Sequence, residues 1–179
     1  MSIRRERLRS LWKDEKGGLL QGMSTEEIGS YFNEIADRWD GMNHCSGEKL
    51  RRIVALAGIQ KGDKVLDLAC GTGVLTGYLL EATPHVTGLD LAENMVALAR
   101  KKYADTSACF LCGDFYSFQG KCFDAIILHN AYPHFEDKEK LVLCLARALE
   151  RGGRLVVAHS LGKDHLNRVH QGRVGNLCR

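Results

Sequence analysis

Two carboxylates and a small-residue loop carry the chemistry that this sequence suggests first. Asp67 lies in the apolar run 65–68, which leads into the loop 69–73, and Asp90 ends a second apolar run at 86–89. The order strand, glycine loop, helix, strand and acid is typical of a crevice that binds a nucleoside at the edge of an α/β sheet. The alternative is that both acids only cap the ends of strands.

Two imidazoles and a phenol follow the fourth apolar run of the chain. His129 ends that run, and Tyr132 and His134 come shortly after it. Ligands of such sheets bind at the carboxyl ends of the strands, where these side chains are expected. Because imidazole titrates near neutral pH, His129 and His134 are candidate bases, and Tyr132 is the third catalytic candidate. His159 is a further possibility, and a purely structural role is the alternative for each histidine.

The elements that must position these residues alternate regularly from Lys64 onward. Strands are predicted at 64–69, 85–90, 108–113, 123–129 and 153–159, and helices at 74–82, 92–103 and 137–150. Further helices are predicted at 24–40, 47–57 and 163–171. Alternation with short connections predicts right-handed crossovers and therefore a mainly parallel, doubly wound α/β sheet of the Rossmann-like class.

Composition and charge limit the possible functions. The chain has 179 residues, of which 45% are hydrophobic, which is enough for one domain. A net charge of +3 is too small to indicate a nucleic-acid partner, and no apolar run approaches the roughly 18 residues that span a membrane. Seven cysteines without a signal peptide indicate a reducing, cytoplasmic location. Cys109 and Cys112 are interpreted as buried thiols, and the His and Cys spacings match no zinc pattern, so no metal is predicted.

The patterning also divides the chain. Residues 1–22 are basic and lack an apolar run, which predicts an arm rather than an export signal. Residues 23–179 are predicted to form a single domain, made of a helical part at 23–60, a core at 61–160 and a short tail at 161–179. The first helix of this domain carries a capping box, with Ser24 three residues before Glu27.

Four blocks of the sequence together resemble the class I S-adenosylmethionine-dependent methyltransferases, over roughly residues 28–160. The blocks are 65–73, 88–92, 112–115 and 123–127, and the turn 149–155 follows them in the expected order. Ala69 stands where many members have glycine. The loop also departs from a dinucleotide fingerprint, because Thr76 replaces its third glycine, and this disfavours NAD. Residues 31–40 are similar to the opening helix of quinone and other small-molecule methyltransferases.

The resemblance implies a role for each matching residue. Asp67 would orient the methionine amino group, Asp90 would accept both ribose hydroxyls, and Asp114 would meet the adenine amino group. The loop backbone would line methionine and ribose, apolar side chains would contact adenine, and the first helix would form a lid. Tyr31 and Trp39 on that helix are alternatively core residues. The cofactor-binding residues implied in this way are Asp67, Ala69, Cys70, Gly71, Thr72, Gly73, Asp90, Leu91, Met95, Asp114, Phe115, His129, Tyr31 and Trp39.

The resemblance predicts a cytosolic enzyme that methylates a small molecule with S-adenosylmethionine. Two alternatives stay open, namely a module that binds the cofactor without turnover and a nucleotide-dependent oxidoreductase. The usual fold of the family has seven strands in the order 3-2-1-4-5-7-6, whereas this sequence supplies five, in the order 3-2-1-4-5. The last two strands are therefore predicted to be missing. An exposed apolar edge on the fifth strand would follow, covered by the tail or by a second copy in a homodimer.

Overall fold

The computed structural model describes residues 24–42, 45–135 and 137–160, and its centre is a five-stranded parallel sheet. The strands lie in the order β3-β2-β1-β4-β5, as the sequence predicts, with every pair parallel. The arm 1–22 and the helix predicted at 163–171 lie outside the described residues. The strands are β1 (Val65–Leu68), β2 (Val86–Asp90), β3 (Cys109–Cys112), β4 (Phe123–His129) and β5 (Leu149–Ala158).

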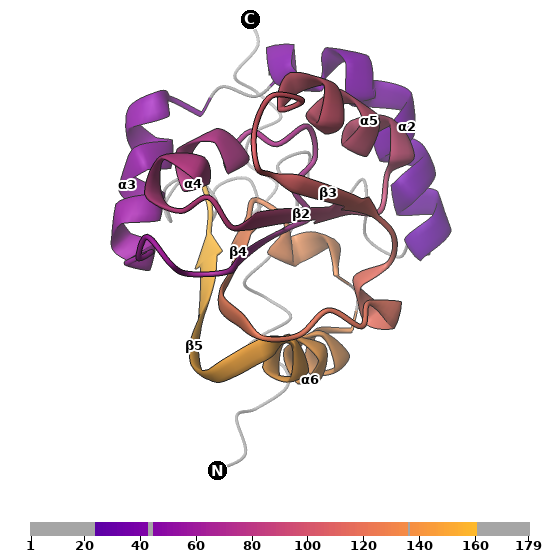
Figure 1. The fold of residues 1–179 in the computed structure, drawn as a ribbon. Coiled ribbons are helices and arrows are strands. Elements are labelled where there is room, and N and C mark those ends of the chain that lie inside the picture. The colour runs from indigo at the N-terminus through magenta and orange to yellow at the C-terminus, as the bar shows by residue number, and fades with distance from the viewer. Residues whose placement is uncertain (1–23, 43–44, 136, 161–179) are drawn as a thin grey trace, which may run out of the picture.

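Helices cover both faces of this sheet (Figure 1). Residues 65 and 127 pack against the helices on one face, and residues 66 and 126 pack against α6 on the other. This alternation is the period of two that a buried strand must show, and it confirms the doubly wound arrangement. The helices are α2 (Thr25–Met42), α3 (Gly47–Ala57), α4 (Thr76–Ala82), α5 (Glu93–Lys102) and α6 (Lys138–Ala148), with two short 3-10 turns, η1 (Phe115–Ser117) and η2 (Tyr132–His134).

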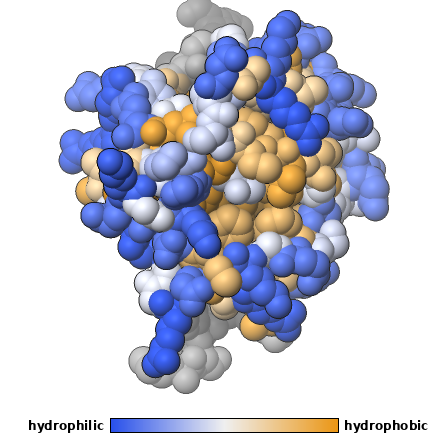
Figure 2. All heavy atoms as spheres, viewed as in Figure 1, coloured by the Kyte–Doolittle hydropathy of each residue, from blue (hydrophilic) through white to orange (hydrophobic). Residues whose placement is uncertain are grey.

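The helix α2 packs on α5 and extends the molecule beyond the sheet (Figure 1). The predicted capping box is present at its start, because the Glu27 backbone N–H donates to Ser24 Oγ over 3.2 Å and the Ser24 N–H donates to Glu27 Oε2 over 2.7 Å. In the same view, Figure 2 shows apolar side chains gathered in the middle of this face, with hydrophilic ones around them. None of the described helices is long and apolar enough to cross a membrane.

The junction of α6 and β5 differs from the prediction. The helix was expected to reach residue 150 and the strand to begin at 153, but α6 ends at Ala148 and β5 begins at Leu149. The register of β5 against β4 shifts between Phe123 and Ala125, and Gly152 takes a left-handed φ of 83°. A bulge of this kind inserts extra residues into a strand, and hydrophobic periodicity does not reveal it.

The prediction that Cys109 and Cys112 are buried is wrong. Both thiols are exposed, because β3 is an edge strand of the sheet and only Phe110 turns into the core from it, with 5% exposure. Within the part of the chain that the structure describes, no group of three or more His, Cys, Asp or Glu side chains could hold a metal ion.

Candidate functional site

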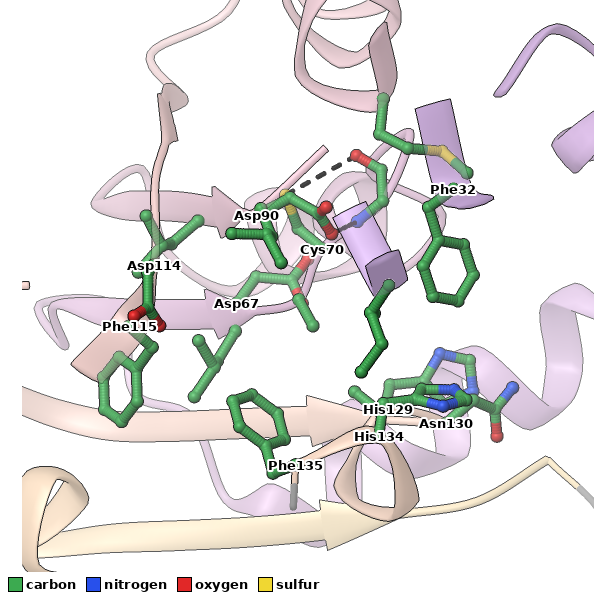
Figure 3. A pocket seen from close by; sticks show the side chains of 18 of the residues that line it. Phe32, Asp67, Cys70, Asp90, Asp114, Phe115, His129, Asn130, His134 and Phe135 are labelled. Carbon is green, nitrogen blue, oxygen red and sulfur yellow. Dashed lines mark hydrogen bonds between the residues drawn. The ribbon is translucent and has the colours of Figure 1, made fainter. Parts of the chain in front are cut away.

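A cavity of about 370 Å³ opens at the carboxyl edge of the sheet. Its walls come from the ends of β1, β2 and β4, the loop after β1, the two 3-10 turns and the inner side of α2. This is where ligands of open α/β sheets bind, and the volume lies within the range of small-molecule sites. Figure 3 shows Asp67, Asp90 and Asp114 on one side of the cavity, with the Phe115 ring beside Asp114, and it shows Phe32, His129 and His134 on the other side.

Asp67 is buried at the floor of the cavity, with 2% of its surface exposed. Its Oδ2 accepts a hydrogen bond from the Thr76 hydroxyl over 2.7 Å. Burial raises the pKa of Asp67 to about 7, the Thr76 hydrogen bond opposes that rise, and repulsion from Asp90 adds to it. The site therefore holds an acid whose ionisation a cationic ligand would favour.

Asp90 ends β2 and faces the same cavity (Figure 3). Its Oδ2 accepts the Gly71 backbone N–H over 2.7 Å and its Oδ1 accepts the Ala92 N–H over 2.9 Å. Burial raises the pKa of Asp90, although these backbone donors act in the opposite direction. An ionised carboxylate offers about four lone-pair positions, so each oxygen of Asp90 can accept one further hydrogen bond.

The two glycines of the loop are required for different reasons. Gly71 has a left-handed φ of 55°, and a Cβ there would lie 3.3 Å from Nε1 of Trp39, which lines the cavity from α2. Gly73 has a φ of 78°, and a Cβ there would lie 2.6 Å from the Tyr103 ring. The Tyr103 hydroxyl also donates to the Gly73 carbonyl over 2.6 Å. Gly71 therefore shapes the cavity, whereas Gly73 makes room for a structural tyrosine.

Polar contacts hold α2 over the cavity. The Asp40 carboxylate accepts a hydrogen bond from the Thr72 hydroxyl of the loop and pairs with Lys102 Nζ on α5 over 2.6 Å. Burial alone would raise the pKa of Asp40, but the Lys102 and Thr72 contacts outweigh it and hold that pKa below its ordinary value. Asn33 adds a contact to α5 by accepting the Asn94 N–H over 2.8 Å. These contacts hold α2 against the glycine loop and α5, and its role as a lid stays a prediction.

His129 and His134 line the other end of the cavity (Figure 3). Nε2 of His129 is buried without a hydrogen-bond partner among the described residues. Burial lowers the pKa of His129 to about 4, with a contribution from His159, so this imidazole is neutral at pH 7. The His134 ring meets the edge of Phe32 on α2, with 5.5 Å between their centroids.

Asn130 also lines this end of the cavity, and its backbone has an uncommon conformation. Its φ is 56°, and its side-chain amide donates to Ser160 Oγ over 2.8 Å while its Oδ1 accepts the Ser160 N–H over 2.7 Å. Left-handed residues other than glycine persist where surrounding contacts determine them, often at ligand sites. The two hydrogen bonds to Ser160 thus fix the backbone directly after His129, the last residue of β4.

The structure brings most of the predicted site residues together. Those that line the cavity are Asp67, Ala69, Cys70, Gly71, Asp90, Leu91, Met95, Asp114, Phe115, His129, His134 and Trp39. Four do not line it, namely Thr72, Gly73, Tyr31 and Tyr132. Thr72 and Gly73 face the lid and Tyr103 instead, and the Tyr31 ring packs against Phe32, with 5.3 Å between their centroids.

The lining residues that the sequence did not predict include Phe32, Asn130, Tyr116 and Phe135. Asn130 and Phe135 stand in the segment that follows β4, so their place after a buried strand was a usable signal. Tyr116 directly follows the predicted pair Asp114 and Phe115. The helical spacing of Phe32 indicated only a buried face, and nothing in the sequence indicates which end of the cavity that face covers.

Comparisons with known proteins agree with this geometry. A family model described as a methyltransferase domain matches residues 66–157. The demethylmenaquinone methyltransferase of Thermotoga maritima is 33% identical over 139 residues, which cover 73% of this chain and 60% of that protein. The enzyme of the same name from Thermus thermophilus is 39% identical over 137 residues, covering 70% and 62%. The chain thus spans about three fifths of the length of the curated relatives that it matches.

Solved structures show the same fold. A TehB-like S-adenosylmethionine-dependent methyltransferase from Corynebacterium glutamicum superposes with a TM-score of 0.59 at 25% identity, covering 80% of this chain and 83% of that one. The magnesium protoporphyrin IX methyltransferase of Synechocystis PCC 6803 gives a TM-score of 0.60 at 22% identity, covering 73% and 74%. The second likeness concerns the fold alone.

Proposed function

The chain belongs to the methyltransferase domain family, and we propose that it transfers the methyl group of S-adenosylmethionine to a small-molecule acceptor. One observation carries the proposal. The buried Asp67 and the partly buried Asp90 lie beside a glycine loop, in a cavity whose far end is lined by imidazoles and aromatic rings. The same cavity therefore offers a polar end for a nucleoside and an apolar end for an acceptor.

The residues present fit this cofactor. Asp90 keeps lone pairs for two ribose hydroxyls after it has accepted the Gly71 and Ala92 amides. Asp67, with its raised pKa, suits the ammonium group of the methionine part, since a nearby cation favours its ionised form. Asp114 and Phe115 lie at the end where adenine would bind, and Trp39 closes the cavity over Gly71.

When bound, the cofactor supplies an electrophilic methyl carbon on a sulfonium, whose S–C bond breaks as the bond to the acceptor forms. The chain must hold the acceptor in line with that carbon and exclude water. Phe32 and Phe135 provide apolar walls, while the neutral His129 can accept a hydrogen bond or a proton from an acceptor hydroxyl. His134 lies at the same end and is the second candidate for this role.

The acceptor is proposed from the relatives together with the shape of the site. Several relatives are named for the methylation of demethylmenaquinone, and one from Psychromonas ingrahamii is named as a ubiquinone/menaquinone biosynthesis C-methyltransferase at 31% identity. An end of the cavity lined by Phe32, His134 and Phe135 suits a flat ring. Reduced demethylmenaquinone is therefore the acceptor that we would assay first.

Binding of S-adenosylhomocysteine tests the cofactor site directly. In a calorimetric titration we expect a micromolar dissociation constant for the wild-type chain, whereas NAD gives no heat. Asp90→Ala should weaken binding by roughly 100-fold, because two charge-assisted hydrogen bonds to the ribose are lost. Asp105→Ala, which removes an exposed acid, is the matched control and should bind as the wild type does. Absence of binding to the folded wild-type protein would contradict the proposal.

The homodimer predicted through the fifth strand belongs to the same proposal. Among the described residues β5 pairs with β4 alone, and its Leu155 and Val157 side chains are each 41% exposed. Unpaired, apolar strand edges favour pairing with a second chain. We expect a dimer in light scattering that Val157→Lys converts to monomer, with Lys101→Glu on α5 as the surface-charge control. A wild-type monomer at all concentrations would contradict this expectation. The cytoplasmic location stays a prediction.

A further inference from the structure

One half-buried amine is used neither by the proposed cofactor site nor by the proposed chemistry. Lys138, the first residue of α6, sends Nζ back to the carbonyls of the turn η2. It donates to the Tyr132 carbonyl over 2.6 Å, to the Pro133 carbonyl over 3.2 Å, and to the Phe135 carbonyl. Its Nζ also lies over the Tyr132 ring, 4.7 Å from the centroid. A single side chain thus engages a whole turn.

The turn needs such a partner. The Tyr132 carbonyl already accepts the Phe135 N–H over 3.4 Å, whereas the last carbonyls of a short 3-10 helix have no donor within the helix. The negative end of the peptide dipoles there favours a cation. Three N–H groups of an ammonium match three carbonyls, whereas a neutral side chain of the same length offers none. Burial lowers the pKa of Lys138 to about 8, while the carbonyls favour the charged form, so the amine remains protonated at pH 7.

The opposite side of the turn faces the cavity. His134 and Phe135 both line it, and their side chains point into it in Figure 3. The His134 ring meets Phe32 of the lid, and the Phe135 ring meets Tyr116 with 6.1 Å between centroids. The backbone hydrogen bonds of this segment span a single turn, such as His134 N–H to the Ala131 carbonyl at 3.0 Å, and the contacts of Lys138 anchor the same segment from α6.

We propose that Lys138 is a positioning residue of the acceptor site, whose ammonium holds the turn 132–135 so that His134 and Phe135 face the acceptor. The link to an acceptor rests on the proposed function, whereas the anchoring of the turn by Lys138 can be tested without any enzymatic activity. Lys138 does not line the cavity itself, so it acts through the residues of the turn.

The test compares Lys138→Met, which keeps the length of the side chain, with Lys138→Arg, which keeps the charge. Amide hydrogen exchange at His134 and Phe135 is the first readout, because it needs neither cofactor nor acceptor. We expect protection to fall roughly tenfold in Lys138→Met, corresponding to the loss of about one net hydrogen bond to a charged group, and to be largely restored in Lys138→Arg. Lys101→Met, an exposed lysine of α5, is the matched control and should change nothing.

Methyl transfer to reduced demethylmenaquinone is the second readout. Lys138→Met should lower kcat by roughly tenfold or more, while the dissociation constant of S-adenosylhomocysteine stays within about twofold of wild type. If the wild type transfers no methyl group to this acceptor, the proposed acceptor fails, but hydrogen exchange still decides the role of Lys138. Unchanged protection in Lys138→Met, or equal losses in the Met and Arg variants, would overturn the inference. Should Lys138→Met not fold, Lys138→Leu, which likewise offers no N–H donor, is judged by the same criteria.

Discussion

Asp67→Asn should make the ligand-free protein more stable at pH 8 and at the same time weaken cofactor binding by roughly 10- to 100-fold. The substitution keeps an oxygen that can accept the Thr76 hydroxyl, so the packing of the floor is retained. It removes a negative charge that is buried beside a second carboxylate, Asp90. Stability and function are therefore expected to change in opposite directions at this position.

The pH dependence follows from the raised pKa of Asp67, which is about 7 in the folded chain against 3.8 for the free side chain. Between these values the folded state binds the proton and the unfolded state does not. The contribution of Asp67 to stability is thus fully present below about pH 4 and is lost as the pH rises through 7. At pH 8 Asp67 is ionised in the folded wild type, which is therefore destabilised by the buried charge. Asp67→Asn should raise the free energy of unfolding by roughly 2 kcal/mol and the Tm by about 4–8 °C.

Two measurements check this prediction. Thermal unfolding of both proteins at pH 5 and pH 8 should show a clearly larger stability advantage of Asp67→Asn at pH 8 than at pH 5. Calorimetry with S-adenosylhomocysteine should show wild-type affinity rising from pH 5.5 to pH 8, because the ligand's ammonium favours ionised Asp67, and this rise should vanish in Asp67→Asn. The matched control is Asp105→Asn, because Asp105 is exposed. Asp63→Asn is unsuitable as a control, because Asp63 forms an ion pair with Arg154. Equal stability of both proteins at pH 8 would contradict the account.

The sheet was predictable from the sequence because each strand is marked locally, by an apolar run and by the polar residue that ends it. The continuous apolar run of β4 must be buried on both faces, and each acid or imidazole that ends a strand must reach the same edge. Asp67, Asp90 and His129 were found in this way, and the structure places all three in one cavity. The β5 bulge was not found, because a left-handed Gly152 changes register without altering hydrophobic spacing.

The contacts that shape the cavity depend on packing between distant segments. Phe32 reaches His134 only because Asp40, Lys102 and Thr72 hold α2 over the loop. The contacts of Lys138 were not predictable for a different reason, because a lysine at the start of a helix is ordinarily exposed to solvent. Its role depends on the backbone of η2 turning its carbonyls toward Nζ. Residue types and spacing predicted the carboxylates and imidazoles that line the cavity, whereas the placement of Phe32 and of the turn 132–135 is determined by tertiary packing.

His129→Gln should reduce kcat for methyl transfer by roughly 100-fold or more while leaving the affinity for S-adenosylhomocysteine within about threefold of wild type. In the folded chain His129 lines the cavity, and its Nε2 is buried and has no hydrogen-bond partner among the described residues. A buried polar atom of this kind is normally paired, so an acceptor hydroxyl that donates to it would gain a hydrogen bond in a water-poor site. His85→Gln, the same change at an exposed histidine, is the matched control.

The pH profile distinguishes this role from that of an ordinary titrating histidine. Because burial lowers the pKa of His129 to about 4, its imidazole is neutral from pH 6 to pH 9 and can accept a hydrogen bond from the acceptor hydroxyl throughout that range. The pH profile of the wild-type rate should therefore show no inflection near pH 6.5 that depends on His129. The profile of His129→Gln should have the same shape at a lower rate. An inflection near 6.5 that is lost only in that variant would mean that acceptor binding restores an ordinary pKa to His129. Retention of full kcat in His129→Gln would instead assign the proton transfer to His134, which lies at the same end of the cavity.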